Sequence, residues 1–241
     1  MCGIFGCILK ERNAAPIIHA ALKRLEYRGY DSAGIAFLDG KGLEVYKTKG
    51  RLRDLRKILP DPLPCVRVGL GHTRWATHGA PSSINAHPHR AGGVVVVHNG
   101  IIENYNELKS RLKAAGHSFL SETDTEVIPQ MISRHMREGL SPREAIEKTL
   151  PLLRGSYALG IMCEASPETL FAVRKGSPLV IGIGNNGYYC ASDVPAILPY
   201  TNKCIFMEDG QLCVMTGDGI EIVHHESHTS IPVRDRTVEI T

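Results

Sequence analysis

The feature that most constrains the fold is a series of short apolar segments of strand length, several of them joined by Asp-Gly or Asn-Gly. These dipeptides supply positive φ at low steric cost and are typical of tight hairpins, so the strands that they join should be antiparallel. They occur at Asp39-Gly40, Asn186-Gly187, Asp209-Gly210 and Asp218-Gly219. The predicted strands cover residues 4–9, 33–38, 43–49, 66–73, 94–99, 157–163, 170–174, 179–183, 188–191, 203–206, 211–215 and 220–224.

Helices are predicted between these strands. Ser141 to Glu144 and Thr123 to Glu126 both have capping-box spacing, which favours a helix start at each. Two further helices are expected, one over residues 13–25 and one that begins near Asn104 and ends at Gly116. With antiparallel sheets inside, these helices should pack on the outer faces.

Size and charge indicate an ordinary globular enzyme. A chain of 241 residues that is 43% hydrophobic can bury a substantial core as one domain. The formal net charge of +3 does not come from a run of basic residues, and this argues against a nucleic-acid or membrane partner. No apolar stretch approaches the roughly 18 residues of a membrane span, and the N-terminus does not resemble a signal peptide. We therefore expect a soluble, cytoplasmic protein.

Cys2 stands out by position among the seven cysteines. The odd number and the absence of a C-x-x-C pair argue against a disulfide framework or a thiolate zinc site. Removal of Met1 would give Cys2 both a thiol and a free α-amine, and the amine, with a pKa near ~8, can take the proton of the thiol. The alternative interpretation is a small residue at the start of a buried strand.

The segment 182–187 matches the dinucleotide-binding pattern G-x-G-x-x-G, but its context is wrong. The residues Tyr188-Tyr189-Cys190 that follow continue as a strand, whereas a dinucleotide site needs a helix there. A hairpin turn explains the pattern better.

Four residues in the middle of the chain together suit a free amino acid that carries a carboxamide. Each has a plain alternative: Arg74 as a surface ion-pair residue, Asn99-Gly100 as a turn, and Asp124 as a carboxylate at a helix start. As a set, Arg74 offers a fork for an α-carboxylate and Asp124 a partner for an α-ammonium. The amide of Asn99 and the backbone N–H of Gly100 would be two donors for an oxyanion, and glycine lets its N–H approach closely.

Seven stretches of the chain resemble the class II, or N-terminal-nucleophile, glutamine amidotransferases, and among them the branch that forms hexosamines. The stretches are 1–6, 25–34, 72–79, 85–89, 98–104, 121–126 and 176–182. They run in order over nearly the whole length. The resemblance implies an α+β fold, a four-layer α/β/β/α sandwich of antiparallel sheets, which agrees with the hairpin pattern.

The resemblance also implies a mechanism without metal or organic cofactor. Cys2 is expected to be the nucleophile, with its own α-amine as general base. Asn99 and Gly100 are expected to form the oxyanion hole. Arg28 matches a position near the nucleophile.

Residues of the substrate site follow from the same resemblance. Arg74 and Asp124 would bind the carboxylate and ammonium groups of L-glutamine. Thr77 and His78 match positions of a loop that closes over glutamine, and Trp75 matches a residue that gates the passage of ammonia.

Domain organisation is expected to follow the hexosamine branch, in which a sugar-phosphate isomerase region uses the ammonia to convert fructose 6-phosphate to glucosamine 6-phosphate. We predict a glutaminase domain over residues 1–231. Residues 232–241 would be a tail or a linker to the isomerase domain, which this sequence lacks. A stand-alone glutaminase is the alternative. A homodimer of the full-length enzyme is possible.

Two other classes of protein would use the same residues differently. A metalloenzyme could draw on the histidines, namely His72, His78, His87, His89 and His98. A glutamine sensor would bind through Arg74 and Asp124 without turnover. Metal content and ammonia release separate these alternatives.

Overall fold

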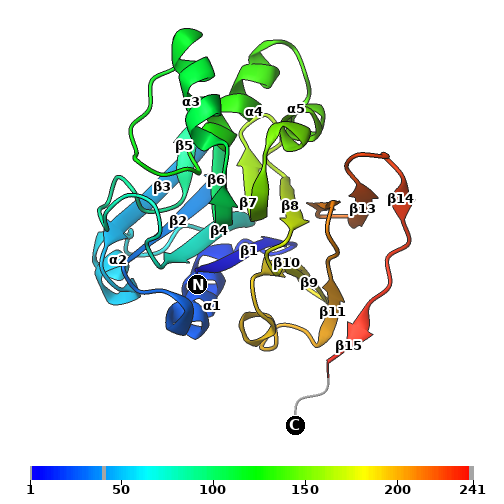
Figure 1. Cartoon of the computed structure of the whole chain (residues 1–241). Coiled ribbons are helices and arrows are strands. Elements are labelled where there is room, and N and C mark those ends of the chain that lie inside the picture. Colours follow the sequence, from blue (N-terminus) through cyan, green and yellow to red (C-terminus); the bar gives the residue numbers. More distant parts are fainter. Residues whose placement is uncertain (1, 40–41, 239–241) are drawn as a thin grey trace.

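Two antiparallel β-sheets form the centre of the structure, a computed structural model that describes residues 2–39 and 42–238 (Figure 1). The first sheet has the order β15-β11-β9-β10-β1-β4-β2-β3, and the second has the order β14-β13-β12-β8-β7-β6-β5. The strands are β1 (Gly3–Leu9), β2 (Ser32–Asp39), β3 (Gly42–Lys49), β4 (Val68–Arg74), β5 (His89–Ala91), β6 (Val94–Ile102), β7 (Gly155–Cys163), β8 (Thr169–Lys175), β9 (Val180–Gly184), β10 (Gly187–Ala191), β11 (Lys203–Phe206), β12 (Gln211–Thr216), β13 (Ile220–His224), β14 (Ser230–Ile231) and β15 (Arg236–Thr237).

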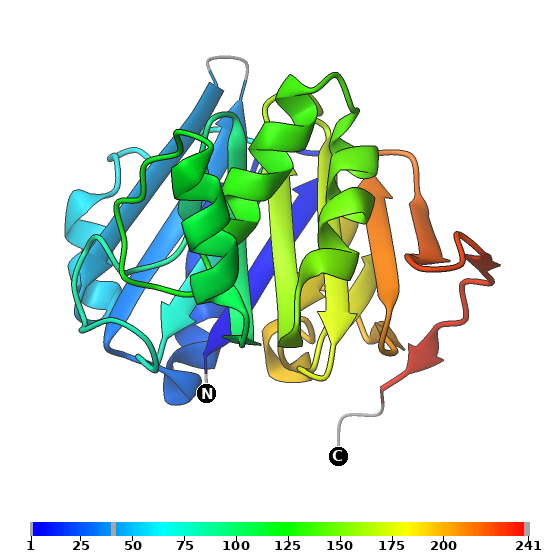
Figure 2. The same ribbon diagram turned by 45° about the horizontal axis from the view of Figure 1, so that its top comes forward.

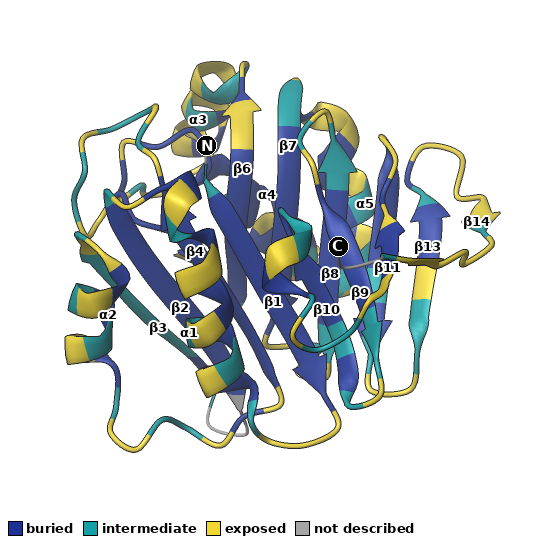
Figure 3. Ribbon diagram, turned by 90° about the horizontal axis from the view of Figure 1, so that it is seen from below, coloured by how far each residue is buried: buried dark blue, intermediate teal, exposed yellow. Residues whose placement is uncertain are grey.

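Helices cover the outer face of each sheet. Figure 2 shows helices in green in front of the second sheet, and Figure 3 shows others on the outer face of the first. The helices are α1 (Ala14–Leu25), α2 (Leu52–Ile58), α3 (Tyr105–Ala114), α4 (Val127–Arg137) and α5 (Pro142–Thr149), with short 3₁₀ turns at Glu26–Arg28, Leu150–Leu152 and Val194–Ala196. The predicted four-layer α/β/β/α sandwich is confirmed.

Three apolar layers hold these four layers of structure together. One lies between α1, α2 and the first sheet, one between the two sheets, and one between the second sheet and α3 to α5. The alternation of strand side chains divides β1 between two of them: Phe5 faces the helices, whereas Ile4 and Ile8 face the second sheet. Both faces of β1 are therefore buried, which explains its continuous apolar sequence.

Pairing between strands places the start of β1 beside the end of β4. Gly3 is opposite Thr73 in the β1–β4 register, while β10 pairs on the other side of β1. Gly6 leaves room for the side chain of Leu70 on the neighbouring strand β4, because a Cβ there would lie 2.5 Å from it. The residues just before β1 and just after β4 are thus neighbours, although about seventy positions separate them in the sequence.

The predicted hairpins are partly confirmed. Antiparallel pairing joins β9 to β10 and β12 to β13, so the G-x-G-x-x-G match is a hairpin and Asp218-Gly219 connects paired strands. Strands β2 and β3 also pair, but the turn at Asp39-Gly40 lies outside the described residues except for the backbone of Asp39. The prediction for Asp209-Gly210 is wrong, because it joins β11 of one sheet to β12 of the other.

Of the two predicted capping boxes, the one at α5 is confirmed and the one at α4 is not. Ser141 and Glu144 form the expected capping box, with the backbone N–H of Glu144 donating to the Ser141 hydroxyl. At α4 the predicted capping box is wrong, because the Glu126 carboxylate accepts the backbone N–H groups of Leu120 and Ser121 instead. Helix α2 and the short strands β5, β14 and β15 were not predicted, since segments this short carry little periodic signal.

The C-terminal segment reaches the first sheet, where β15 pairs with β11. Part of the predicted tail or linker over residues 232–241 thus contacts the sheet, and the division at residue 231 stays a prediction. No helix among residues 2–39 and 42–238 is long and apolar enough to span a membrane.

Four buried histidines lie where β4, β5 and β6 come together: His72, His87, His89 and His98. The rings of His72 and His87 stack with centroids 4.2 Å apart, and the His89 ring meets His87 edge-on at 4.6 Å. Burial lowers the pKa of all four, to about 3 for His72, with smaller contributions from neighbouring positive charges at His87 and His89. They are therefore neutral at physiological pH.

This cluster predicts that acid destabilises the fold. A histidine whose folded pKa is below its unfolded value of about 6.5 stabilises the protein fully above pH 6.5, and this contribution is lost as pH falls towards the folded pKa. Between pH 7.5 and 5 each such histidine should remove about 1–2 kcal/mol from the free energy of unfolding. Urea unfolding followed across this range measures the loss.

A matched pair of variants isolates the cluster. His89→Gln should make the decline in stability shallower, whereas His228→Gln, which changes an exposed histidine, should leave it unchanged. A free energy of unfolding that stays constant from pH 7.5 to 5 would contradict the assignment of neutral buried imidazoles.

Candidate active site

One cavity brings together most of the predicted site residues. Its volume is about 270 Å³, and it lies where the start of β1 and the end of β4 meet β6 of the other sheet. Of the predicted residues, those that line it are Cys2, Arg28, Arg74, Trp75, Thr77, Asn99, Gly100 and Asp124. His78 is the predicted residue that is not among the lining residues.

Cys2 directly precedes β1, and its sulfur is held by the chain that follows β4. The backbone N–H of Trp75 donates to Cys2 Sγ at 3.2 Å. Burial raises the pKa of the Cys2 thiol, while the Trp75 hydrogen bond and the charges of Arg74 and Arg28 act in the opposite direction. Since burial is the largest effect, the thiol needs a base to become a thiolate at neutral pH.

The backbone carbonyl of Cys2 accepts two hydrogen bonds that fix its position. Arg28 Nε donates at 3.0 Å, and Asn99 Nδ2 donates at 3.0 Å from the other sheet. Arg28 also forms an ion pair with Asp193, whose carboxylate accepts the hydroxyl of Tyr27. The Arg28 guanidinium thus ties the start of β1 to the segment after β10.

Asn99 and Gly100 lie side by side on β6. The Asn99 amide oxygen accepts a hydrogen bond from His72 Nε2 at 3.1 Å, so its NH₂ group faces Cys2. Gly100 has φ of +132°, and a Cβ there would lie 2.0 Å from the backbone oxygen of Ser156. Only glycine fits this position, for a steric reason that the sequence does not reveal.

Arg74 and Asp124 are two buried, oppositely charged residues on the cavity wall. Arg74 Nη2 donates to the backbone oxygens of His78 and Gly79, while Nη1 is buried without an acceptor among the described residues. Burial lowers the pKa of Arg74, and the charges of Cys2, Asp124 and Asp31 counteract this. Asp124 Oδ2 accepts the backbone N–H of Ile102 at 2.8 Å.

The loop after β4 carries the other predicted binding residues. Trp75 is 46% exposed and packs edge-on against Tyr30, with ring centroids 5.6 Å apart. The backbone N–H of Ala76 donates to Asp31 Oδ2 at 2.9 Å, which anchors the loop. The His78 ring lies against Tyr105 at 5.7 Å, so it packs on α3 rather than on the cavity wall.

Several lining residues were not predicted as site residues. They are His87, His98, Ile101, Thr125, Ser156, Ser177 and Pro178. All of these except Ser156 lie in stretches that resemble the family, and that signal was available in the sequence. Ser156 carried none, because only the pairing of β6 with β7 places it beside Gly100.

The histidines of the metalloenzyme alternative form hydrogen bonds and ring contacts with one another and with nearby polar groups. His87 Nδ1 accepts the backbone N–H of His98, and His98 Nδ1 is 2.8 Å from the hydroxyl of Thr125. Within residues 2–39 and 42–238, no group of three or more His, Cys, Asp or Glu side chains is arranged to hold a metal ion.

Comparison with known sequences identifies a matching family and several longer relatives. The pattern of a family described as glutamine amidotransferase domain matches residues 72–199, slightly more than half of the chain. Glutamine–fructose-6-phosphate aminotransferase (isomerizing) of Symbiobacterium thermophilum is 50% identical over 92% of this chain and 36% of that protein. The enzyme of the same name from Acinetobacter baylyi is 44% identical over 100% of this chain and 39% of its own length. The chain thus spans less than two-fifths of these relatives.

Solved structures agree on the fold. A structure described as the allosteric regulatory enzyme of purine biosynthesis superposes with a TM-score of 0.81 at 27% identity, covering 93% of this chain and 49% of that one. A glutamine aminotransferase class-II domain protein from Silicibacter pomeroyi superposes with a TM-score of 0.61 at 15% identity, covering 93% of this chain and 99% of that one. The second match concerns the fold alone.

The family match, described as a glutamine amidotransferase domain, covers the part of the chain that builds most of the cavity. The matched segment 72–199 contains the end of β4, all of β6 and the residues just before α4, and these parts carry Arg74, Asn99, Gly100 and Asp124 to the cavity. On this evidence, the chain belongs to the glutamine amidotransferase domain family.

Proposed function

We propose that this chain hydrolyses the side-chain amide of L-glutamine to glutamate and ammonia through a thioester on Cys2. The observation that carries the proposal is the convergence on one cavity of a cysteine, an amide and glycine pair, an arginine and an aspartate. A cavity of about 270 Å³ lies at the small end of ligand sites, which suits a single amino acid.

Strand geometry supports Asn99 and Gly100 as the oxyanion hole. Backbone N–H groups of alternate residues point to the same edge of a strand. On β6, the N–H of His98 reaches His87 and the N–H of Ile102 reaches Asp124, so both point away from β7. The N–H of Gly100, between them, is directed to that same edge, beside the NH₂ of Asn99.

The reaction would proceed in two steps. The sulfur of Cys2 attacks the carboxamide carbon while the thiol proton passes to the α-amine of Cys2, once Met1 has been removed. The C–N bond then breaks, and the amine returns the proton to the leaving ammonia. Water attacks the thioester, the same amine takes its proton, and glutamate leaves as the thiol is restored. No metal or organic cofactor takes part in this scheme.

Arg74 and Asp124 supply the charges that a free amino acid requires. The unpaired Nη1 of Arg74 is a donor for the α-carboxylate, and the Asp124 carboxylate is a partner for the α-ammonium. Thr77 and His78 would help to bind glutamine as the loop after β4 closes, and Trp75 would gate the passage of ammonia. Arg28 would hold the carbonyl of Cys2 in place.

The relatives suggest a use for the ammonia. Their names include fructose 6-phosphate as well as glutamine, and they are much longer than this chain. We propose that in a longer protein a sugar isomerase region uses the ammonia to form glucosamine 6-phosphate. A cytoplasmic location and a homodimer of that longer enzyme are further proposals.

The first test concerns the nucleophile. Cys2→Ala should abolish release of ammonia from glutamine, because Cys2 is the only cysteine among the described residues that line the cavity. Cys65→Ala, at an exposed cysteine outside the cavity, should keep wild-type activity. Ammonia release is measured on protein whose intact mass shows that Met1 has been removed. Glutamine binding by the wild-type protein without any ammonia would instead identify a sensor.

The second test concerns the oxyanion hole. Asn99→Ala removes one donor, which should lower kcat by about 10²- to 10³-fold. The value of KM should change little, because the donor acts on the tetrahedral intermediate more than on bound glutamine. Asn106→Ala, at an exposed asparagine of α3, serves as the control. Unchanged kcat in Asn99→Ala would exclude this role.

The third test concerns recognition of the α-carboxylate. Arg74→Ala should raise KM for glutamine by about 10- to 100-fold, because a charge-assisted hydrogen bond contributes about 1.5–3 kcal/mol. Arg74→Lys should recover only part of the loss, since lysine lacks the planar fork. Arg53→Ala changes a well-exposed arginine and should have no effect. Steady-state kinetics distinguish these outcomes, and an unaltered KM in Arg74→Ala would refute the assignment.

A further inference from the structure

We propose that His72 is a positioning residue that fixes the orientation of the Asn99 carboxamide, so that its NH₂ group and not its oxygen faces the reacting carbon. This inference deepens the proposed function and rests on it. His72 lies on β4 of the first sheet and Asn99 on β6 of the second, so the contact joins the two sheets.

The hydrogen-bond partners of His72 identify which of its nitrogens carries the proton. Nε2 lies 3.1 Å from the backbone oxygen of His98 and 3.1 Å from Asn99 Oδ1. The backbone oxygen of His98 can only accept, so Nε2 must be the donor whichever way the Asn99 amide points. Nδ1 is buried without a partner among the described residues, which suits a bare lone pair better than an N–H. The geometry thus selects the tautomer with the proton on Nε2.

This donor decides between the two orientations of the Asn99 amide. In the observed orientation, Oδ1 accepts from His72 and Nδ2 donates to the carbonyl of Cys2 at 3.0 Å. A rotation of the amide by 180° would place an NH₂ against the Nε2–H of His72 and an oxygen against the carbonyl of Cys2. Both new contacts would be repulsive, so two partners together hold one orientation.

The orientation matters for catalysis because an NH₂ group has two hydrogens. One of them is engaged by the carbonyl of Cys2, and the other is left for an oxyanion in the cavity. A reversed amide would present an oxygen lone pair where negative charge develops, and would oppose the reaction. His72 therefore acts through Asn99 and need not touch the substrate.

The surroundings of His72 keep it in place and uncharged. Its side chain is fully buried, and the ring of His87 stacks on it at 4.2 Å. Burial holds the pKa of His72 far below neutrality, so the ring carries one N–H throughout the working pH range. A second proton on Nδ1 would have no acceptor there among the described residues.

The test is a double-mutant cycle between the two residues, read as steady-state kinetics of ammonia release. His72→Leu should lower kcat by about 10- to 100-fold with KM within about threefold, because part of the oxyanion donor is lost. In an Asn99→Ala background, the same substitution should lower kcat by no more than about twofold, because the amide that it orients is gone. Equal effects in both backgrounds would overturn the proposal.

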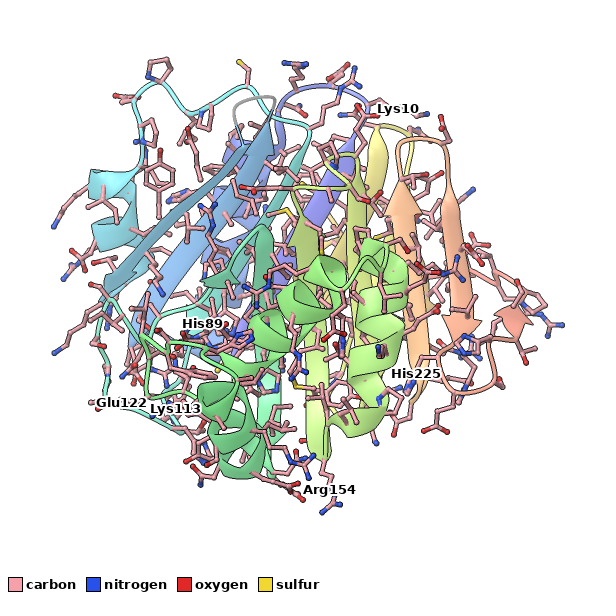
Figure 4. All side chains as sticks on the ribbon, turned by 90° about the horizontal axis from the view of Figure 1, so that it is seen from above. Lys10, His89, Lys113, Glu122, Arg154 and His225 are labelled. Carbon is pink, nitrogen blue, oxygen red and sulfur yellow. The ribbon has the colours of Figure 1, made fainter. Side chains whose placement is uncertain are left out.

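Two further variants separate positioning from general damage to the core. His72→Gln keeps an amide donor that can reach the place of Nε2, and it should recover most of the lost kcat. His225→Leu removes another buried imidazole, at the end of β13, and should leave kcat unchanged. In Figure 4, His89 of the cluster lies to the left of the green helices and His225 lies to their right. A kcat of His72→Gln as low as that of His72→Leu would count against the proposal.

A further measurement uses the wild-type protein, so its result does not depend on whether a variant folds. Nitrogen-15 NMR of the histidine side chains should show His72 as the neutral tautomer protonated at Nε2 near pH 7, and a proton on Nδ1 would overturn the proposal. Absence of ammonia release by the wild-type protein would refute the proposed function. Ammonia release by the wild type together with additive effects in the cycle would refute the positioning role alone.

Discussion

The packing of two antiparallel sheets face to face is the constraint on which the rest of the structure depends. Apolar side chains of β1 and β4 meet those of β6 and β7 across a buried layer. Because this packing fixes the position of each strand, the polar residues at the start of β1, at the end of β4 and on β6 lie close together. Cys2 comes from one sheet and Asn99 from the other, and the hydrogen bond between them crosses the junction.

At that junction, buried polar groups replace the apolar layer. His72, His87, His89 and His98 lie close together without charge, because ionised imidazoles could not be solvated there. Their hydrogen bonds instead orient neighbouring groups, including the Asn99 amide and the hydroxyl groups of Thr123 and Thr125. A histidine-rich sequence that suggested metal binding is better understood as a neutral hydrogen-bonding cluster in the core.

Local sequence patterns predicted most of the fold. Strand periodicity and glycine turns predicted the long strands and their antiparallel pairing, because both signals act within a few residues. The predictions that failed are those whose outcome depends on tertiary packing. Asp209-Gly210 has the local chemistry of a hairpin but connects two sheets, and Glu126 is used by Leu120 and Ser121 instead of capping α4. Such choices depend on what packs nearby, which a dipeptide cannot encode.

The sequence by itself determined the residue types and the spacings that mark the family, from Cys2 through Arg74 and Asn99-Gly100 to Asp124. It did not show that His78 faces α3 or that Ser156 forces position 100 to be glycine. Only the tertiary structure decided how these residues meet, because strands far apart in the chain are brought into register by packing. The orientation of the Asn99 amide is the clearest case, since a histidine from the opposite sheet selects it.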